Sequence, residues 1–299
     1  MARRPRFAAA DLGGIVPPMT TPFRANGSID EKAFRGQVRF LTKCGAHGLA
    51  VGGSTGEGHT LRTEEVRRLV AIAVEEAGEA VPIIAGIIVD STQQAIERGK
   101  AVADLGVAAL QITPVHYLFR PDDDHMLRHF EQVAKAVRLP ILIYNVVPWT
   151  YLSPELLVRI MKRVPRVIGV KQSAGDMKLL ADLVMAAPRD RRIFSAVDAL
   201  LYPSFALGAH GAIAAILAAA PEACVALWDA VRAGDHKRAR RLHEGLLRLW
   251  NAMPGDCLPA CTKYAQSLQG VKAGRPWAPM QEPTPRQQKA IAAALAKLT

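Results

Sequence analysis

The stretch Ile168–Gly175, IGVKQSAG, places a lysine in a run of residues typical of a buried strand. Lysine is rarely buried without a partner or a chemical role, because burial disfavours its charged form. A neutral amine at Lys171 is a nucleophile toward a ketone, and the product is a Schiff base. The protonated imine draws electrons from its neighbours, so that an adjacent carbon loses a proton or a carbon–carbon bond breaks. The setting of Lys171 therefore indicates Schiff-base chemistry.

Lys171 has a structural alternative, which is an ion pair with a buried acid on a neighbouring strand end. Asp198 is the one clear acidic candidate at such a position. A single ion pair would explain the lysine alone, whereas Schiff-base chemistry also explains the groups that accompany it. Each proton transfer of that chemistry needs a relay, and a phenol beside two hydroxyls provides one.

Two further segments supply that relay and a place for an anion. Gly52–Gly58, GGSTGEG, has small residues that leave backbone N–H groups open to an anion, and Ser54 and Thr55 add two hydroxyls. Tyr144 ends another apolar run. Taken alone, the first segment is equally a glycine-rich turn, and Tyr144 is equally a core tyrosine with a bonded hydroxyl. Together with Lys171 they predict a site for a 2-oxo acid.

Short apolar runs alternate along the chain with stretches whose apolar residues recur at helical spacing. The strands and helices that this alternation predicts must bring Lys171, Tyr144 and Ser54 together. We expect eight strands, within Gly13–Thr20, Gly48–Thr55, Pro82–Val89, Ala109–Val115, Pro140–Val147, Val167–Ser173, Arg192–Val197 and Gly211–Leu217. Continuous apolar runs suit parallel strands that are covered on both faces. Helix starts are expected at Thr63 and at Ser153-Pro154-Glu155.

Eight strand–helix units predict the α/β fold class, as a (β/α)8 TIM barrel with a C-terminal helical extension. We place the barrel in residues 1–233 and a helical subdomain packed on it in residues 234–299. A doubly wound open sheet is the alternative, but the first strand lacks the glycine fingerprint expected there. In a (β/α)8 barrel the C-terminal strand ends carry the chemistry, and Ser54, Tyr144 and Lys171 all occupy such ends.

Composition narrows the class of protein. The chain has 299 residues, is 50% hydrophobic, and carries a net charge of +11. Its basic residues are scattered apart from His236–Arg241, which fits a solvated helix face better than a nucleic-acid patch because no aromatic residues interleave with it. No long apolar run predicts a membrane span, and the basic residues at the N-terminus do not resemble a secretory signal. Four cysteines are too few for a disulfide scaffold, and Cys257 and Cys261 lack histidines at metal spacing. We therefore expect a cytoplasmic protein with no nucleic-acid or membrane partner, no metal and no cofactor.

The motifs GGSTGEGHTLRTEE, YNVVP and GVKQSAGD, in this order and separation, resemble those of the dihydrodipicolinate synthase / N-acetylneuraminate lyase family of class I aldolases. The resemblance covers almost the whole chain. It implies that Lys171 forms the Schiff base, that Tyr144 shuttles protons, and that Ser54 links to Tyr144. It also implies that Thr55 binds the carboxylate of pyruvate.

The same resemblance implies further contacts and an assembly. Backbone groups at Ala196 and Ile213 would line the pyruvate pocket. The family usually forms tetramers built from tight dimers, in which one aromatic residue reaches the neighbouring active site. We therefore expect a homotetramer or a homodimer.

Two departures from the family pattern bear on the substrate. Family members often carry two aromatic residues after the TP of the fourth strand, and the second completes the relay. Here His116 occupies that place and Tyr117 follows it, so either residue is a candidate for the substrate pocket. The synthases also carry an arginine after the YNVP tyrosine that grips the carboxylate of the aldehyde substrate. This chain has Trp149 nearest that place, and Trp cannot grip a carboxylate bidentately.

The function expected from sequence is therefore a Schiff-base lyase, an aldolase or a dehydratase, that acts on pyruvate or another 2-oxo acid. Because of Trp149, we expect a second substrate other than the aldehyde of lysine biosynthesis. The alternative is a genuine 4-hydroxy-tetrahydrodipicolinate synthase. An alternative of another class is a non-catalytic protein that binds 2-oxo acids.

Overall fold

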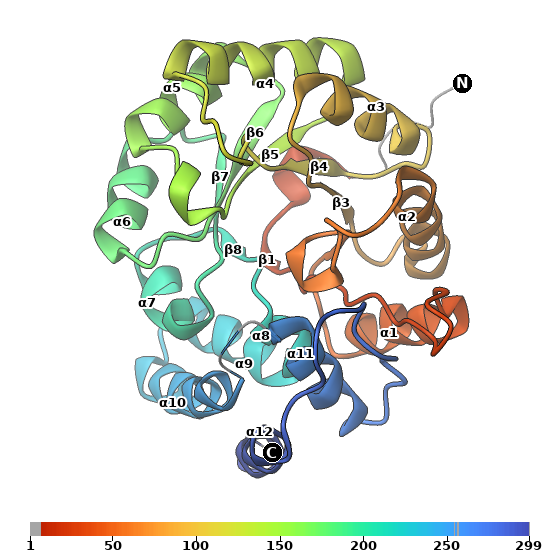
Figure 1. The fold of residues 1–299 in the computed structure, drawn as a ribbon. Coiled ribbons are helices and arrows are strands. Elements are labelled where there is room, and N and C mark those ends of the chain that lie inside the picture. Colours follow the sequence, from red (N-terminus) through yellow and green to blue (C-terminus); the bar gives the residue numbers. More distant parts are fainter. Residues whose placement is uncertain (1–6, 254, 256, 299) are drawn as a thin grey trace.

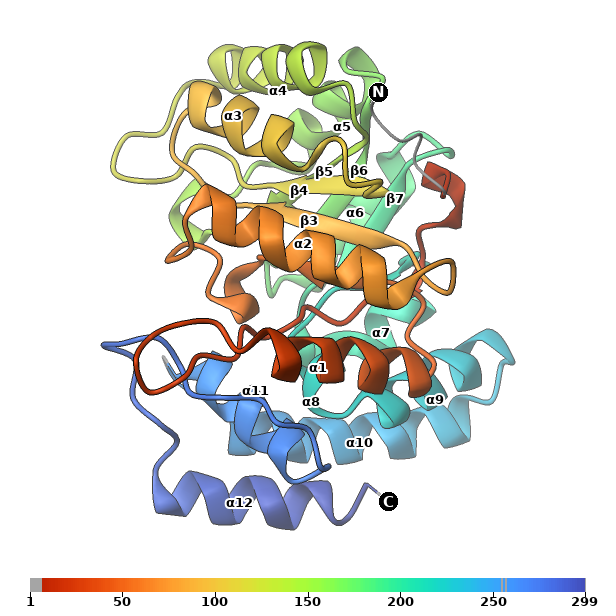
Figure 2. The same ribbon diagram turned by 90° about the vertical axis from the view of Figure 1, so that its right-hand side faces the viewer.

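The eight predicted strands form a barrel that is wrapped by helices (Figure 1). The computed structural model describes residues 7–253, 255 and 257–298, so the basic N-terminal residues 1–6 lie outside the described part. Figure 2 shows the same barrel from the side. The chain therefore has the predicted (β/α)8 TIM-barrel fold, with helices that follow the barrel at the C-terminus.

All strand pairs of the barrel are parallel. The strands are β1 (Gly14–Ile15), β2 (Leu49–Val51), β3 (Ile83–Ile87), β4 (Ala109–Ile112), β5 (Ile141–Asn145), β6 (Val167–Gln172), β7 (Arg192–Ser195) and β8 (Gly211–Ala212). Their order is β1-β8-β7-β6-β5-β4-β3-β2, and a parallel bridge between Pro18 and Ala50 joins the first strand to the second. Each strand falls within its predicted segment, so the strand prediction is confirmed.

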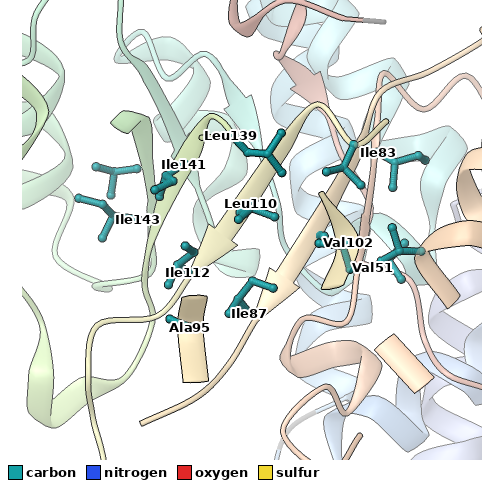
Figure 3. Close-up of a cluster of buried hydrophobic side chains, with 14 of the residues drawn as sticks. Val51, Ile83, Ile87, Ala95, Val102, Leu110, Ile112, Leu139, Ile141 and Ile143 are labelled. Carbon is teal, nitrogen blue, oxygen red and sulfur yellow. The ribbon is translucent and has the colours of Figure 1, made fainter. Parts of the chain in front are cut away.

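Alternation of side chains assigns each strand residue to one of two faces. On β5, Ile141 and Ile143 belong to the apolar layer between strands and helices, whereas Leu142 belongs to the buried cluster of the barrel interior. Figure 3 shows the outer layer around β2–β5, where helix α3 packs against the strands. Tyr144 has the parity of Leu142, and this places its side chain inside the barrel.

Helices connect the strands and cover the barrel. The helices of the barrel are α1 (Glu31–Lys43), α2 (Thr63–Ala77), α3 (Thr92–Val102), α4 (Asp123–Val137), α5 (Pro154–Arg163), α6 (Met177–Ala186), α7 (Leu201–Ala206) and α8 (Ile216–Ala219). Short 3-10 helices are η1 (Ala9–Asp11), η2 (Ser54–Gly56), η3 (Pro148–Thr150) and η4 (Asp198–Leu200). The predicted starts are confirmed, because α2 begins at Thr63 and the Ser153 hydroxyl accepts a hydrogen bond from Leu156 N–H at the start of α5.

Four helices follow the barrel strands. They are α9 (Pro221–Arg232), α10 (His236–Ala252), α11 (Leu258–Ser267) and α12 (Pro285–Leu295). One buried apolar cluster joins them to the barrel, running from Ile15 on β1 through Leu227 on α9 to Leu249 on α10 and Ile291 on α12. In the His236–Arg241 run only Ala239 is buried, so its basic side chains lie on the exposed face of α10.

The helices that the structure describes differ from membrane-spanning helices in length or in apolar character. None of those helices is both long and apolar enough to span a bilayer.

Candidate active site

Lys171 and Tyr144 lie side by side at the C-terminal ends of two neighbouring strands. Strand β6 carries Lys171, strand β5 carries Tyr144, and the two residues are register partners in the sheet. Both are buried, with Lys171 4% and Tyr144 1% exposed. The Lys171 Nζ atom lies 3.9 Å from the centroid of the Tyr144 ring. Within the described residues, no carboxylate forms an ion pair with Lys171, so the structural alternative of a buried ion pair is not what the fold provides.

The Gly-rich segment after β2 brings Ser54 to the phenol of Tyr144. The Tyr144 hydroxyl donates a hydrogen bond to Ser54 Oγ at 2.9 Å, and the Ser54 N–H lies 3.4 Å from Tyr144 Oη. The turn of η2 places Thr55 next to this pair, and Thr55 is 9% exposed. A Cβ atom at Gly58 or at Gly86 would collide with the Gly52 carbonyl, so this fold of the segment requires glycine there.

The electrostatics of this cluster favour ionisation of the phenol. Burial opposes the charged form of Tyr144, but the neighbouring Lys171 ammonium and the hydrogen bonds with Ser54 together lower the pKa of Tyr144 below its usual value of 10.0. A phenol with a lowered pKa exchanges protons more readily near neutral pH than an ordinary tyrosine does. Lys171, Tyr144 and Ser54 therefore form a connected group that can hold and pass a proton.

Glu57 anchors the Gly-rich segment from behind. Its carboxylate accepts hydrogen bonds from Lys263 Nζ on α11 at 2.5 Å and from Trp277 N–H at 2.6 Å. Lys263 also donates to the Arg275 carbonyl at 2.7 Å, and the Glu57 and Lys263 side chains are almost fully buried. Sequence reasoning did not assign these two residues a role. Since 206 positions separate them, no local pattern could have paired them.

Asp198 lies at the start of η4, at the end of the neighbouring strand β7. Its carboxylate accepts a hydrogen bond from Ile216 N–H at 2.7 Å, and burial raises its pKa to about 6 although that hydrogen bond and the Lys171 charge favour ionisation. Asp198 thus contributes to the electrostatic environment of the lysine without contacting it as an ion-pair partner. The sequence had offered Asp198 only as a partner for Lys171.

Gln111 on β4 is a polar residue of the barrel interior that the sequence analysis missed. It is 1% exposed, and neither its amide nitrogen nor its amide oxygen has a hydrogen-bond partner among the described residues. A Cβ atom built on Gly53 would lie 3.6 Å from Gln111 Nε2 and 4.0 Å from Tyr144 Oη. The amide therefore adjoins the same segment as the phenol. A glutamine inside an apolar run was the only sequence signal.

The backbone positions expected near the substrate lie at the ends of the last two strands. The Ala196 N–H donates to the Gln172 carbonyl, and the Ile213 N–H donates to the Ser195 carbonyl. Ile213 is fully buried in the barrel interior, at the end of β8. The fold thus brings Ala196 and Ile213 to the strand ends that also carry Lys171.

The remaining expected site residues lie at the outer edge of the site. Tyr117 is 69% and Trp149 is 68% exposed, and the Trp149 indole N–H donates to the carbonyls of His116 and Tyr117. The His116 Nδ1 atom lies 3.1 Å from the Pro114 carbonyl and 3.3 Å from an Asp90 carboxylate oxygen. Within this chain, no hydrogen bond of the described residues joins His116 or Tyr117 to Tyr144 or Ser54. Trp149 instead fastens the loop after β4 to the loop after β5.

Among the residues the structure describes, no group of three or more His, Cys, Asp or Glu side chains is arranged to hold a metal ion. Cys257 and Cys261 are buried free thiols at the start of α11, with their sulfur atoms 3.7 Å apart.

Comparisons with known proteins agree with this geometry. The family model of the dihydrodipicolinate synthetase family matches residues 11–298. The chain belongs to this family. A 4-hydroxy-tetrahydrodipicolinate synthase from Methanopyrus kandleri is 34% identical over 274 residues, which are 91% of each chain.

Two solved structures show the breadth of the family. A dihydrodipicolinic acid synthase family member from Escherichia coli K12, in complex with pyruvate, is 25% identical with a TM-score of 0.91 and covers 96% of this chain and 98% of its own. The N-acetylneuraminate lyase from Fusobacterium nucleatum is 27% identical with a TM-score of 0.88 and covers 96% and 99%. The chain is therefore a lyase with the class I aldolase mechanism of the dihydrodipicolinate synthetase family.

Proposed function

We propose that Lys171 forms a Schiff base with the keto carbon of pyruvate or of a related 2-oxo acid. The observation that carries this proposal is the buried contact between Lys171 Nζ and the Tyr144 ring, with Ser54 hydrogen-bonded to the same phenol. Thr55, through its hydroxyl and its backbone N–H, binds the substrate carboxylate. Backbone groups at Ala196 and Ile213, at the ends of β7 and β8, line the same pocket.

The reaction begins when the neutral amine of Lys171 adds to the keto carbon to give a carbinolamine. Tyr144 donates a proton to the departing hydroxyl, which leaves as water, and the protonated imine forms. The phenolate of Tyr144 then takes a proton from the carbon next to the imine, and an enamine results. Ser54 stabilises the phenolate through its hydrogen bond. The enamine attacks an aldehyde in a condensation, and in the reverse direction the carbon–carbon bond breaks.

The assembly and location follow the family resemblance. We propose a homodimer or homotetramer, in which His116 or Tyr117 of one copy approaches the relay of another. The exposure of Tyr117 in the single chain supports this assignment. Four free cysteines suit a reducing compartment, and we place the protein in the cytoplasm.

The first candidate for the full reaction is 4-hydroxy-tetrahydrodipicolinate synthase. Curated relatives that cover nearly the whole chain carry this name, for example those from Methanopyrus kandleri and Phenylobacterium zucineum. These names favour the synthase over the different second substrate expected from sequence. The second candidate, a lyase for a substrate with an uncharged distal half, rests on Trp149. Its indole occupies the outer edge of the site, nearest the place where the synthases carry an arginine.

The Schiff base is tested by trapping. Pyruvate with sodium borohydride should add a reduced pyruvyl group to Lys171 and inactivate the protein, because hydride converts the imine to a stable secondary amine. Intact-mass and peptide spectrometry locate the adduct. Lys171→Ala should give none, and Lys178→Ala, which removes an exposed lysine, should react like the unmodified protein. An unmodified protein without an adduct on Lys171 would refute the mechanism.

The second substrate is tested with aspartate semialdehyde and an uncharged aldehyde of similar length. If the protein is the synthase, the unmodified enzyme should prefer aspartate semialdehyde, and Trp149→Arg should raise its kcat/KM for that aldehyde only slightly. For the second candidate, Trp149→Arg should raise the kcat/KM ratio for aspartate semialdehyde by about tenfold to a hundredfold, which is the value of one charge-assisted bond. Trp149→Met is the control, because it removes the indole without adding charge.

A further inference from the structure

A second cavity lies at the end of the barrel where the strands begin, away from the strand ends that carry Lys171. It has a volume of about 1130 Å³. Its walls include the residues just before β1, β2, β3 and β8, together with parts of α7 and α9. In Figure 2 the N-terminal segment that borders it is drawn in red at the right-hand side of the barrel. Neither the proposed mechanism nor the family comparison assigns a role to this cavity.

In two histidines on its wall, a hydrogen bond from the backbone determines which ring nitrogen carries the hydrogen. His47 precedes β2 and its Nδ1 accepts a hydrogen bond from Ile15 N–H at 3.2 Å. His210 precedes β8 and its Nδ1 accepts from Ile193 N–H at 3.1 Å. A ring nitrogen that accepts a hydrogen bond carries no hydrogen, so Nε2 of each neutral ring is a donor. Both rings line the cavity, and no hydrogen bond among the described residues uses either Nε2, so both donors are free to bind a ligand.

Two arginines on the same wall carry charges that the described chain does not neutralise. Arg192 donates to the Ala10 carbonyl through Nη2 at 2.8 Å, and its Nε has no partner among the described residues. Arg232 lies over the Trp228 ring, with Cζ 5.7 Å from the ring centroid. No ion pair of the described residues involves either arginine, in contrast to Arg67, which pairs with a carboxylate.

The acidic groups near the cavity do not offset these charges. Asp11 is the one acidic residue among the described wall residues, and its carboxylate already accepts the Ala8 N–H at 2.7 Å. Asp229 is close enough to act on His47, but burial nevertheless lowers the pKa of His47 below its usual value. The wall therefore presents two guanidinium groups, two imidazole N–H donors and a third imidazole, that of His236, around one engaged carboxylate.

Apolar side chains form another part of the wall. Phe205 and Trp228 meet edge to face with their ring centroids 5.0 Å apart, and Leu12, Val81 and Val231 extend the same surface. The volume exceeds what a bare inorganic ion fills and lies just above the roughly 300–1,000 Å³ that is usual for sites of small organic molecules. Cationic groups beside an aromatic wall match a ligand with two parts, an oxyanion and an apolar body.

We propose that this cavity is a second binding site, which takes a small organic molecule that carries a phosphate or carboxylate group. Arg192, Arg232 and the Nε2–H groups of His47 and His210 hold the oxyanion. The organic part lies against Phe205 and Trp228. This site is independent of the Schiff-base reaction and does not rest on the proposed function.

The test uses four probes, which carry the anionic group, the aromatic body, or both. Phenyl phosphate and benzoate carry the two oxyanions on an aromatic body, phenol lacks the anion, and inorganic phosphate lacks the body. Isothermal titration of the full chain, in a phosphate-free buffer of constant ionic strength, should show 1:1 binding of phenyl phosphate or benzoate and none of phenol. Which of the two binds more tightly distinguishes a phosphate ligand from a carboxylate ligand.

Variants locate the binding. Arg232→Gln and Arg192→Gln should each lower the affinity for the anionic probe by about tenfold to a hundredfold, as expected for the loss of one charge-assisted contact. Arg238→Gln removes an exposed arginine of α10 that does not line the cavity and should leave the affinity unchanged. Arg232 is exposed, so Arg232→Gln is expected to fold, and its thermal unfolding checks this. The proposal is overturned if millimolar phenyl phosphate and benzoate both fail to bind, or if Arg232→Gln binds as tightly as Arg238→Gln.

Discussion

Lys171 and Tyr144 occupy a layer of the barrel interior that is nearly closed to water, and their chemistry follows from that position. A lysine in this layer meets a ring face and a phenol, and none of the described carboxylates pairs with it. Asp198, whose ionisation the Lys171 charge favours, is held by Ile216 N–H and has a pKa of about 6 because of its burial. Below that pH Asp198 is neutral, and above it a negative charge faces the amine.

Asp198 provides a pH-dependent prediction. The folded state raises the pKa of Asp198 from 3.8 to about 6, which corresponds to about 3 kcal/mol between the two protonation states. A raised folded pKa means that the folded protein binds the proton more tightly than the unfolded chain does. Its contribution to stability is therefore present below pH 3.8 and lost as the pH rises through 6. Asp198→Asn, which keeps an acceptor for Ile216 N–H, should be the more stable protein at pH 7.5.

The measurement is urea unfolding of both proteins between pH 4 and pH 8. The difference in the free energy of unfolding should grow by up to about 3 kcal/mol from the acidic to the alkaline side. Asp182→Asn, at an exposed surface pair, serves as the control and should show no comparable growth. A difference between Asp198→Asn and the unmodified protein that stays constant with pH would contradict the raised pKa.

Single residues differ in how well the sequence predicts them. Lys171 and Tyr144 were predictable, because each interrupts or ends an apolar run at a strand end. Gln111 also interrupts such a run, but its meaning depends on whether its side chain points into the barrel, and a buried strand shows no polar face to settle that. Asp198 was recognisable as an acid near the lysine, whereas its hydrogen bond to Ile216 depends on how two loops meet.

The segment Ser54–Glu57 is the element on which the site depends most. On one side, Gly58 and Gly86 pack closely against the Gly52 carbonyl at the start of the segment. On the other side, the Glu57 carboxylate binds Lys263 and so holds the segment in place. Through Glu57, helix α11 and residues 275–277 support the loop that carries Ser54 and Thr55. The C-terminal helices therefore contribute to the geometry of the site as well as to the core.

Breaking this support should affect both stability and substrate binding. Lys263→Met leaves the Glu57 carboxylate buried without its cation, and loss of one partner of a buried pair costs about 3–5 kcal/mol. We expect a lower free energy of unfolding, and a higher KM for pyruvate because the Ser54–Thr55 backbone is less well held. Urea unfolding and steady-state kinetics with pyruvate measure the two effects.

The double variant Glu57→Gln with Lys263→Met is the matched control. It removes both charges and keeps the Trp277 N–H acceptor, so it should regain much of the lost stability. If the pair positions the loop, pyruvate KM should recover together with stability. A Lys263→Met protein with unchanged stability and unchanged KM would show that the ion pair has no such role.

Elements were more predictable than their mutual contacts. Every strand lies within an expected apolar run, since parallel strands covered on both faces have a distinct pattern. The order of strands followed from the alternation with helices. The support of η2 by α11 was not predictable, because it joins residues 206 positions apart and depends on the path of the chain after α10.

The whole molecule exposes a cluster of large apolar side chains beside the active site. The loop after β4 carries Tyr117, Leu118 and Phe119, which are 69%, 70% and 84% exposed, and Trp149 lies against it. Contiguous exposed apolar side chains of this size mark interaction surfaces. Since the family resemblance implies a dimer in which an aromatic residue reaches the neighbouring site, we propose that this loop lies at the interface between two copies.

That assignment predicts the mass of the protein in solution. Light scattering should give two or four times the chain mass of 32.3 kDa. Leu118→Asp combined with Phe119→Asp should shift the mass toward a single chain, because two carboxylates in an apolar interface lose their hydration. The same variant should lose lyase activity while Lys171 remains buried in each barrel. Leu268→Asp, at an exposed leucine after α11, should keep both the mass and the activity. An unmodified protein that is a fully active monomer would place the whole relay within one chain and remove the interface from the mechanism.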